Sequence, residues 1–238
     1  MSPPGGPTRI VVERLRSLPP LVVEDGLAVA SCFFENDPST VEGGFDEWVA
    51  QNNPNRFERK DIEVINSGMR ARSPYGPWER LYGRKHDWLL RLLPEWDLAE
   101  TAPDEWSAAD CTRFLCIAIE KTTVKSVGRA MATKVLHMKR PRLVPILDRL
   151  VVETVGGSND WKSPTPTAAL VDHLRLVATD NAAALQDIQA RLTGLAFQPT
   201  KVRILDAILW TAHPQSSLHA DLGWPTRVGP TRVRSPRR

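Results

Sequence analysis

The sequence contains few cysteines and no long apolar run. Its three cysteines, Cys32, Cys111 and Cys116, cannot form a paired disulfide framework, and no histidine stands at a metal-ligand spacing from them. No apolar run approaches the roughly 20 residues of a membrane span, and the first residues, MSPPGGPTR, lack the apolar core of a signal peptide. We therefore expect a cytoplasmic protein without disulfides and without a membrane partner.

Apolar residues make up 42% of the 238 residues, which is enough for the core of one domain or of two small subdomains. The 20 prolines cluster between apolar stretches and so mark the ends of structural elements. Both ends of the chain are rich in Pro, Gly, Ser and Arg. We predict a folded domain over residues 9–213, between a disordered tail at residues 1–8 and a basic Pro/Arg-rich tail at residues 214–238.

The apolar residues recur at helical intervals, as Val202, Leu205, Ile208 and Leu209 do. No convincing strand alternation accompanies them. The sequence therefore predicts an all-α fold, a bundle of about ten helices with short connections. The expected helices lie near residues 20–35, 45–51, 59–71, 77–93, 106–120, 128–138, 148–155, 167–178, 182–193 and 199–212.

The net charge of +3 is unevenly distributed along the chain. Residues 121–149 carry a single acid, Asp148, among eight bases, and five arginines follow Asp221 without an acid. This pattern predicts a basic face that attracts a polyanion, although basic residues that only solvate helix surfaces would give the same composition. The bases of the run are Lys121, Lys125, Arg129, Lys134, Lys139, Arg140, Arg142 and Arg149.

A tight polar turn at residues 125–128 leads directly into a predicted helix. Backbone N–H groups at a helix start lack intrahelical partners, and with the helix dipole they can bind a phosphate. Gly128 permits close approach of the backbone, and Lys125 and Arg129 supply charge. An ordinary helix start would explain the same residues.

Asp148 begins the next predicted helix, after a stretch that Pro141 and Pro145 keep extended. Because Asp is a favoured N-cap, capping is one explanation of this residue. Catalysis is the other, since the surrounding cations would hold the carboxylate ionised. Beside bound DNA, such a group stabilises a sugar cation or orients a water.

The run VGRAMATKVLHMKRPRLVPILDRLV resembles the helix-hairpin-helix (HhH-GPD) DNA glycosylase superfamily. In that family a Pro-Gly-Val-Gly hairpin and a helix precede an extended, proline-containing stretch that ends in the catalytic Asp. Gly128 stands 20 residues before Asp148, which is the family's spacing from the second hairpin glycine. The segment KRPRLVPILDRLV also resembles a set of uncharacterised actinobacterial proteins.

The resemblance implies a helix-hairpin-helix fold in two subdomains, with the hairpin at residues 120–138 and a catalytic loop at residues 141–148. It implies that Asp148 is the catalytic residue. Together with the basic run, it assigns DNA binding to Lys125, Ser126, Val127, Gly128, Arg129, Lys134, Lys139 and Arg140.

Some residues depart from the family's pattern. Lys125 and Ser126 stand where the family has Pro and the first Gly. Ala130 occupies the place of the Schiff-base lysine of bifunctional members, which implies a monofunctional enzyme, and Lys134 is the nearest amine one turn further on. No cysteine follows Cys116, so the iron–sulfur cluster of some members is not expected. The sequence implies no cofactor and no catalytic metal.

A glycosylase needs a pocket that receives the extruded base. The segment INSGMRARSPYGPWERLYGR contains polar side chains and rings suited to a pocket or wedge, although Trp78 and Tyr82 also fit a core face. Asp46 is one of several carboxylates that could act as a second acid. The candidates for the base pocket or wedge are Asn66, Arg70, Arg72, Tyr75 and Trp78.

These observations predict a monofunctional DNA glycosylase that hydrolyses the N-glycosidic bond of a flipped damaged, mismatched or modified base. Its role would be repair, or defence against phage DNA with modified bases. We expect a monomer in the bacterial cytosol that binds double-stranded DNA of the nucleoid. One alternative is a non-catalytic helix-hairpin-helix DNA-binding protein. Another is an interaction module whose basic helix meets an acidic protein or RNA.

Overall fold

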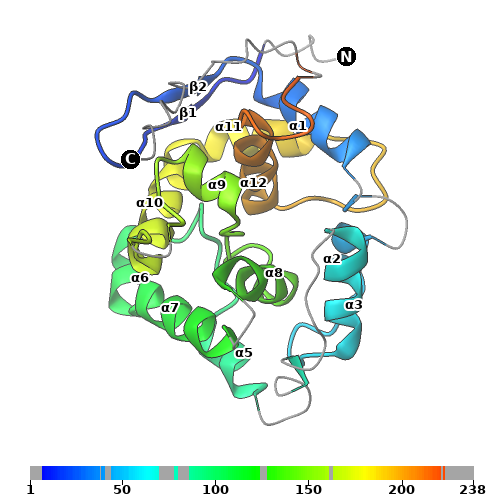
Figure 1. Cartoon of the computed structure of the whole chain (residues 1–238), viewed down its shortest axis with the longest axis vertical. Helices are drawn as coiled ribbons and strands as arrows, with labels where there is room; N and C mark the ends of the chain where they lie inside the picture. Colours follow the sequence, from blue (N-terminus) through cyan, green and yellow to red (C-terminus); the bar gives the residue numbers. More distant parts are fainter. Residues whose placement is uncertain are drawn as a thin grey trace, which may run out of the picture.

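A computed structural model shows a mostly helical protein with one small sheet (Figure 1). The structure describes residues 7–37, 39–40, 44–69, 78–79, 86–123, 128–160, 163–220 and 222. The predicted helical class is confirmed. In chain order the elements are β1 (Ile10–Val12), β2 (Leu21–Val23), α1 (Gly26–Asn36), α2 (Phe45–Gln51), α3 (Arg59–Gly68), α5 (Trp88–Leu92), α6 (Pro103–Ala108), α7 (Cys111–Thr122), α8 (Arg129–Lys139), α9 (Arg149–Thr154), α10 (Thr167–Asp180), α11 (Ala182–Arg191) and α12 (Lys201–Ala212).

The N-terminal strands correct the prediction of a helix over residues 20–35. β1 and β2 pair antiparallel, with Ile10 opposite Val23. The valines of β2 favour an extended backbone because they branch at Cβ. Helix α1 begins only after Asp25, whose side chain accepts a hydrogen bond from N of Ala28 at 3.0 Å. An N-cap therefore sets the boundary that apolar spacing alone missed.

The helix predicted over residues 106–120 is two helices, α6 and α7. Between them Asp110 adopts a left-handed backbone with φ 51°, which Asp tolerates better than most residues. Pro103 occupies the first turn of α6, where its missing N–H costs nothing. The predictions for α2, α3 and α8 to α12 agree with the structure to within a few residues.

Helix α12 is the interior helix of the fold. Eleven of its twelve residues are buried, which is the pattern of a helix enclosed on all sides. It packs against α1, α9, α10 and α11, in the upper half of Figure 1. Trp210 is the one residue of α12 that is only half-buried. The charged residues of α12 are therefore held inside the protein.

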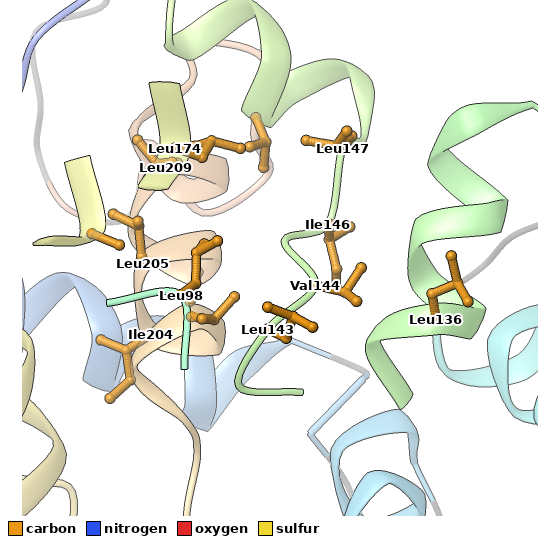
Figure 2. Close-up of a cluster of buried hydrophobic side chains, with 14 of the residues drawn as sticks. Leu98, Leu136, Leu143, Val144, Ile146, Leu147, Leu174, Ile204, Leu205 and Leu209 are labelled. Atoms are coloured by element: carbon orange, nitrogen blue, oxygen red, sulfur yellow. The ribbon is translucent and has the colours of Figure 1, made fainter. Parts of the chain in front are cut away.

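An extended segment between α8 and α9 runs through the core. Figure 2 shows its side chains between Leu136 of α8 and the leucines of α12. All of them are buried to within a few per cent, which explains how a stretch with two prolines can be fixed without a helix of its own. The apolar residues of the segment in Figure 2 are Leu143, Val144, Ile146 and Leu147.

The folded part extends beyond both predicted limits. Thr8 is buried, and its hydroxyl donates a hydrogen bond to Oδ2 of Asp187 at 2.8 Å. Beyond α12, residues 214–220 continue in turns, and Leu218 belongs to the buried core. No helix in the described part of the chain is long and apolar enough to cross a membrane.

Candidate functional site

The extended segment determines where Asp148 lies. Oγ1 of Thr133, on α8, accepts a hydrogen bond from N of Leu147 at 3.0 Å. At the other end, Oγ1 of Thr200 donates to the carbonyl of Pro141 at 2.8 Å. The segment is thus tied at both ends, and Asp148 follows it directly at the start of α9.

Asp148 is half-buried and both caps a helix and faces a pocket. Its Oδ1 accepts a hydrogen bond from N of Val151 at 3.0 Å, so the predicted N-cap is confirmed. The same side chain lines a pocket of about 220 Å³. A carboxylate has acceptor capacity beyond one hydrogen bond, so a capping Asp can still bind a second group.

The pocket has aromatic and charged walls. It is formed by α1, α8, α12, the end of α3 and the start of α9. The rings of Phe33 and Trp210 meet edge to face with centroids 5.8 Å apart, and Met69 lies at the α3 side. The volume is below the ~300–1,000 Å³ of pockets for drug-sized ligands, so it suits one small ring system. Its charged residues are Asp37, Lys134, Asp148, Arg203 and Asp206.

One face of α12 supplies Arg203, Asp206 and Trp210 to the pocket, at the i, i+3 and i+7 positions of a helix face. Nη1 of Arg203 donates to Oδ2 of Asp206 at 2.5 Å. The other oxygen, Oδ1 of Asp206, is buried and has no hydrogen-bond partner among the described residues. Asp206, which lines the pocket, therefore has a buried carboxyl oxygen to which no described residue donates a hydrogen bond.

Arg203 joins the pocket to α2. Its Nε and Nη2 donate to the two oxygens of Asp46 at 2.7 and 2.8 Å, and Nη2 also reaches Oγ of Ser39 at 2.9 Å. The guanidinium lies over the ring of Phe33, 4.9 Å from its centroid. Asp46, one of the several carboxylates considered as a second acid, is thus a buried partner of Arg203. Asp206 shares the pocket with Asp148 instead.

Two of the three carboxyl groups that line the pocket, those of Asp148 and Asp206, have unequal surroundings. Burial raises the pKa of Asp206 to about 7, Arg203 opposes the rise, and the nearby charge of Asp148 adds to it. Asp148 is only half-buried. Two acids in such different environments are the arrangement that proteins use for acid and base roles.

Lys139 does not lie on a DNA-binding surface, and that prediction is corrected. Its side chain is fully buried, and Nζ donates to Oδ1 of Asp61 at 2.8 Å, Oδ1 of Asn52 at 2.9 Å and the carbonyl of Asn53 at 3.2 Å. Burial lowers the pKa of Lys139, and Asp61 opposes this shift. The lysine has become a structural link between α8, α3 and the loop after α2.

Arg140 is also buried, which corrects its predicted role as a DNA ligand. Nη1 donates to the carbonyl of Pro54 at 2.7 Å, Nη2 to that of Leu90 at 2.8 Å, and Nε to that of Leu93 at 3.1 Å. A guanidinium has five N–H donors, so one arginine can satisfy carbonyl groups from several loops.

Further bases of the run are paired at the surface. Arg142 lies 3.1 Å from Asp97, and Arg149 lies 3.4 Å from Glu153. Lys134, half-buried on α8, lines the pocket beside Asp148. The run therefore provides less free positive charge than its composition indicates.

Gly128 and Arg129 stand at the open start of α8. Gly128 is exposed, and a Cβ at this position would meet no atom of the described residues within 4 Å, so their packing does not require glycine here. Arg129 donates to the carbonyl of Thr165 at 2.7 Å and to Oδ1 of Asn159 at 3.0 Å. The other hairpin residues predicted to bind DNA, Lys125, Ser126 and Val127, lie outside the described residues.

The predicted base-pocket residues do not gather at Asp148. Trp78 is fully buried, so it is a core residue, and its predicted role as a base contact is corrected. Asn66 is half-buried on α3 and does not line the pocket, whereas Met69, three residues later, does. Arg70, Arg72, Tyr75 and Tyr82 fall in the part of the chain that the structure does not describe.

Sequence reasoning missed Arg203, Asp206, Trp210 and Phe33. A signal was present in α12, where Arg203 and Asp206 stand three residues apart within residues 202–210, a stretch that is otherwise apolar. Charged residues in a helix that is apolar on all sides must be paired or functional. Among the described residues, no group of three or more His, Cys, Asp or Glu side chains is placed to hold a metal.

Comparison with known families gives a match over most of the chain. Residues 28–213 match the model described as a family of unknown function, DUF6308. No curated protein and no solved structure matches the chain. The matched region covers the pocket apart from Ser217 and includes its three carboxyl residues, Asp37, Asp148 and Asp206.

Proposed function

The chain belongs to the DUF6308 family, and because the family's function is unknown, we propose one from the chemistry of the site. We propose that the protein is a monofunctional DNA glycosylase that hydrolyses the N-glycosidic bond of a base extruded from double-stranded DNA. The observation that carries the proposal is the position of Asp148, which faces a small pocket with aromatic walls and a second carboxyl group.

The chemistry of glycoside cleavage explains why this arrangement suits the reaction. The departing base leaves the sugar with oxocarbenium character, which a carboxylate stabilises. The hydrogen bond from Val151 to Oδ1 holds the Asp148 side chain in place. Its other oxygen then faces the sugar or orients the attacking water, and a flipped base stacks near Phe33 and Trp210.

The hairpin would hold the DNA backbone. Helices α7 and α8 pack against each other, with the short connection at residues 123–128 between them, as the helices of a hairpin motif do. Gly128 lies at the exposed start of α8, where the packing of the described residues does not require glycine and none of their side chains caps the helix. Its backbone N–H groups are available to a phosphate at this position.

The decisive experiment measures base release by the full chain. Duplexes with adenine opposite oxidised guanine, a deaminated base or an alkylated base, together with phage DNA that carries hypermodified bases, would be assayed by mass spectrometry of the released bases. Asn also caps helices, so Asp148→Asn should keep the fold and lose at least about 10²-fold of the release.

Asp25 provides the matched control. It caps α1 with the same hydrogen bond by which Asp148 caps α9, from the backbone N three residues later to Oδ1, at 3.0 Å in both cases. Asp25→Asn should leave base release unchanged. Undiminished release by Asp148→Asn would contradict the assignment of the carboxylate.

A charge reversal tests the hairpin separately. Lys125→Glu should weaken duplex binding and reduce the slope of log affinity against log salt by about one. Lys60→Glu is the control, because Lys60 is an exposed lysine of α3 outside the hairpin. Equal binding by both variants would remove the hairpin from the interface and favour a partner other than DNA.

A non-catalytic DNA-binding protein is the second candidate. The hydrogen bond between Asp148 and Val151 favours it, since a capping role explains an Asp at this position without any reaction. Tight duplex binding without release of a base from any substrate in the survey would establish this candidate instead.

A further inference from the structure

Asp206 combines deep burial with an unused oxygen. Its side chain is 7% exposed, Oδ2 accepts a hydrogen bond from Arg203, and Oδ1 has no partner in the described part of the chain. A buried carboxyl oxygen without a partner costs free energy unless a proton or a ligand satisfies it. Because Asp206 lines the pocket beside Asp148, that ligand would be whatever the pocket binds.

We propose that Asp206 carries a proton on Oδ1 and is the general acid that protonates the departing base, an inference that rests on the proposed glycosylase function.

The charges around Asp206 favour the protonated form. One guanidinium, that of Arg203, faces two carboxyl groups, and Asp46 takes two of its N–H donors while Asp206 takes one. Asp148 adds negative charge, and Lys134 is the other cation that lines the pocket with it. A proton on Asp206 leaves one buried carboxylate for one buried guanidinium, which is the balanced state.

The direction of the pKa shift of Asp206 agrees with this balance of charges. Burial and Asp148 raise the pKa of Asp206 to about 7, against the opposing effects of Arg203 and Lys134. Arg203 also interacts electrostatically with Asp46 and Asp37, so its charge is shared among several carboxyl groups. An acid that holds its proton close to neutral pH can donate it at physiological pH.

The proposed step balances in atoms and charge. The bond between C1′ and the base nitrogen breaks, and its electron pair stays with the base. Asp206 transfers its proton to another ring nitrogen, so the base leaves as a neutral molecule. The oxygen of a water bonds to C1′, and the proton released by that water passes to Asp148. Exchange with solvent then removes this proton from Asp148 and returns one to Asp206.

This role selects a class of substrate. A neutral purine, or another base with an accepting ring nitrogen, needs the proton in order to leave. An N7-methylated purine already carries a positive charge and does not need it. Asp148 acts on the sugar and is needed for both classes, so the two substrates separate the two carboxyl groups.

The first test uses duplexes that contain either hypoxanthine or N7-methylguanine. Asp206→Asn should reduce release of hypoxanthine by about 10²-fold or more and leave release of N7-methylguanine within about threefold of wild type. Asp148→Asn should reduce both, and Asp25→Asn neither. Wild-type release of hypoxanthine should fall as the pH rises through the pKa of Asp206, about 7.

The outcomes separate a failure of the general-acid role from a failure of the proposed function. If the wild type releases no base from any substrate, the proposed function is overturned, and the acid role with it. If the wild type releases hypoxanthine and Asp206→Asn does so at the same rate, only the acid role is overturned.

The second test does not depend on activity. Carbon-13 NMR of the aspartate carboxyl groups in the full chain should show one group that titrates near pH 7, and Asp206→Asn should lack it while Asp25→Asn keeps it. An Asp206 that is already ionised at pH 5 overturns the proposal whether or not a base is released.

Discussion

Two buried polar clusters of this protein look alike in composition and differ in how completely they are bonded. In the Lys139–Asp61 cluster, Nζ of Lys139 has three acceptors, and Asp61 binds with both of its oxygens, Oδ2 accepting from N of Glu58 at 2.8 Å. In the Arg203–Asp206 cluster, Asp206 binds the described residues with one oxygen only. We call the first cluster closed, because both of its charged groups are fully hydrogen-bonded and it serves packing. We call the second cluster open, because Oδ1 of Asp206 has no hydrogen-bond partner among the described residues and Asp206 lines a pocket.

The comparison shows that burial of charge does not by itself indicate function. A fully bonded ion pair links helices and has no capacity left for a ligand. An incompletely bonded group needs another explanation, and the pocket supplies one. The following predictions test this difference, beginning with the largest expected effect.

Removal of one partner from the closed cluster should cost the most stability. Lys139→Met leaves Asp61 buried without its cation, so the free energy of unfolding should fall by about 3–5 kcal/mol in urea titrations at pH 7. The double variant Lys139→Met, Asp61→Leu should recover most of the loss because no uncompensated charge remains. A single variant as stable as wild type would show that the cluster is not a structural link.

The open cluster should respond to pH. The unfolded carboxyl of Asp206 has its ordinary pKa of 3.8 and the folded one a pKa of about 7, so the folded state holds more protons between these values. The proton on Asp206 therefore stabilises the folded state at low pH, and this contribution is lost as the pH rises towards 7. We expect the free energy of unfolding to fall by about 1–3 kcal/mol between pH 5 and pH 8 for this reason. Urea titrations of wild type and Asp206→Asn at both pH values isolate the effect. A pH-independent difference between the two proteins would contradict it.

The two capping aspartates should be equal in stability and unequal in activity. Asp148→Ala and Asp25→Ala should each cost about 1 kcal/mol, since each removes one cap hydrogen bond, while the Asn variants cost less. Thermal unfolding measures these costs, and base release should decline only for the changes at Asp148. A much larger stability cost at Asp148 would mean that its place in the pocket is structural.

Lys134 should matter least to stability. It lies five residues before Lys139 on the same helix, but it is half-buried and lines the pocket. Lys134→Met should therefore change the free energy of unfolding by less than about 1 kcal/mol. The measurement is the same urea titration as for Lys139→Met. A loss as large as that of Lys139→Met would place both lysines in one structural network.

The helices were predictable where their boundaries depend on local chemistry. Asp148 after Pro145 and before an apolar run predicts a cap and a helix, and α9 begins there. The error at residues 20–35 arose because apolar spacing in a short run does not separate a strand from a helix. The break at Asp110 depends on a single left-handed residue, which no periodicity reveals.

The charged residues were the least predictable part of the site. Lys139 and Arg140 belong to a basic run and were assigned to its surface, since lysine and arginine are mostly exposed in proteins. Their burial depends on acceptors from residues 52–61 and 90–93, far away in the sequence. Asp206 was missed for the same reason, because its neighbours Asp148 and Lys134 come from other helices.

By itself, the sequence determined the helical class, the ends of most helices and the position of Asp148 at a helix start, because these follow from periodicity and from hydrogen bonds between residues three or four apart. Only the tertiary structure decided which charged side chains are buried and paired inside the protein and which line a cavity. That choice depends on contacts between distant segments, and it leaves Asp148 beside a buried acid with one oxygen unbonded.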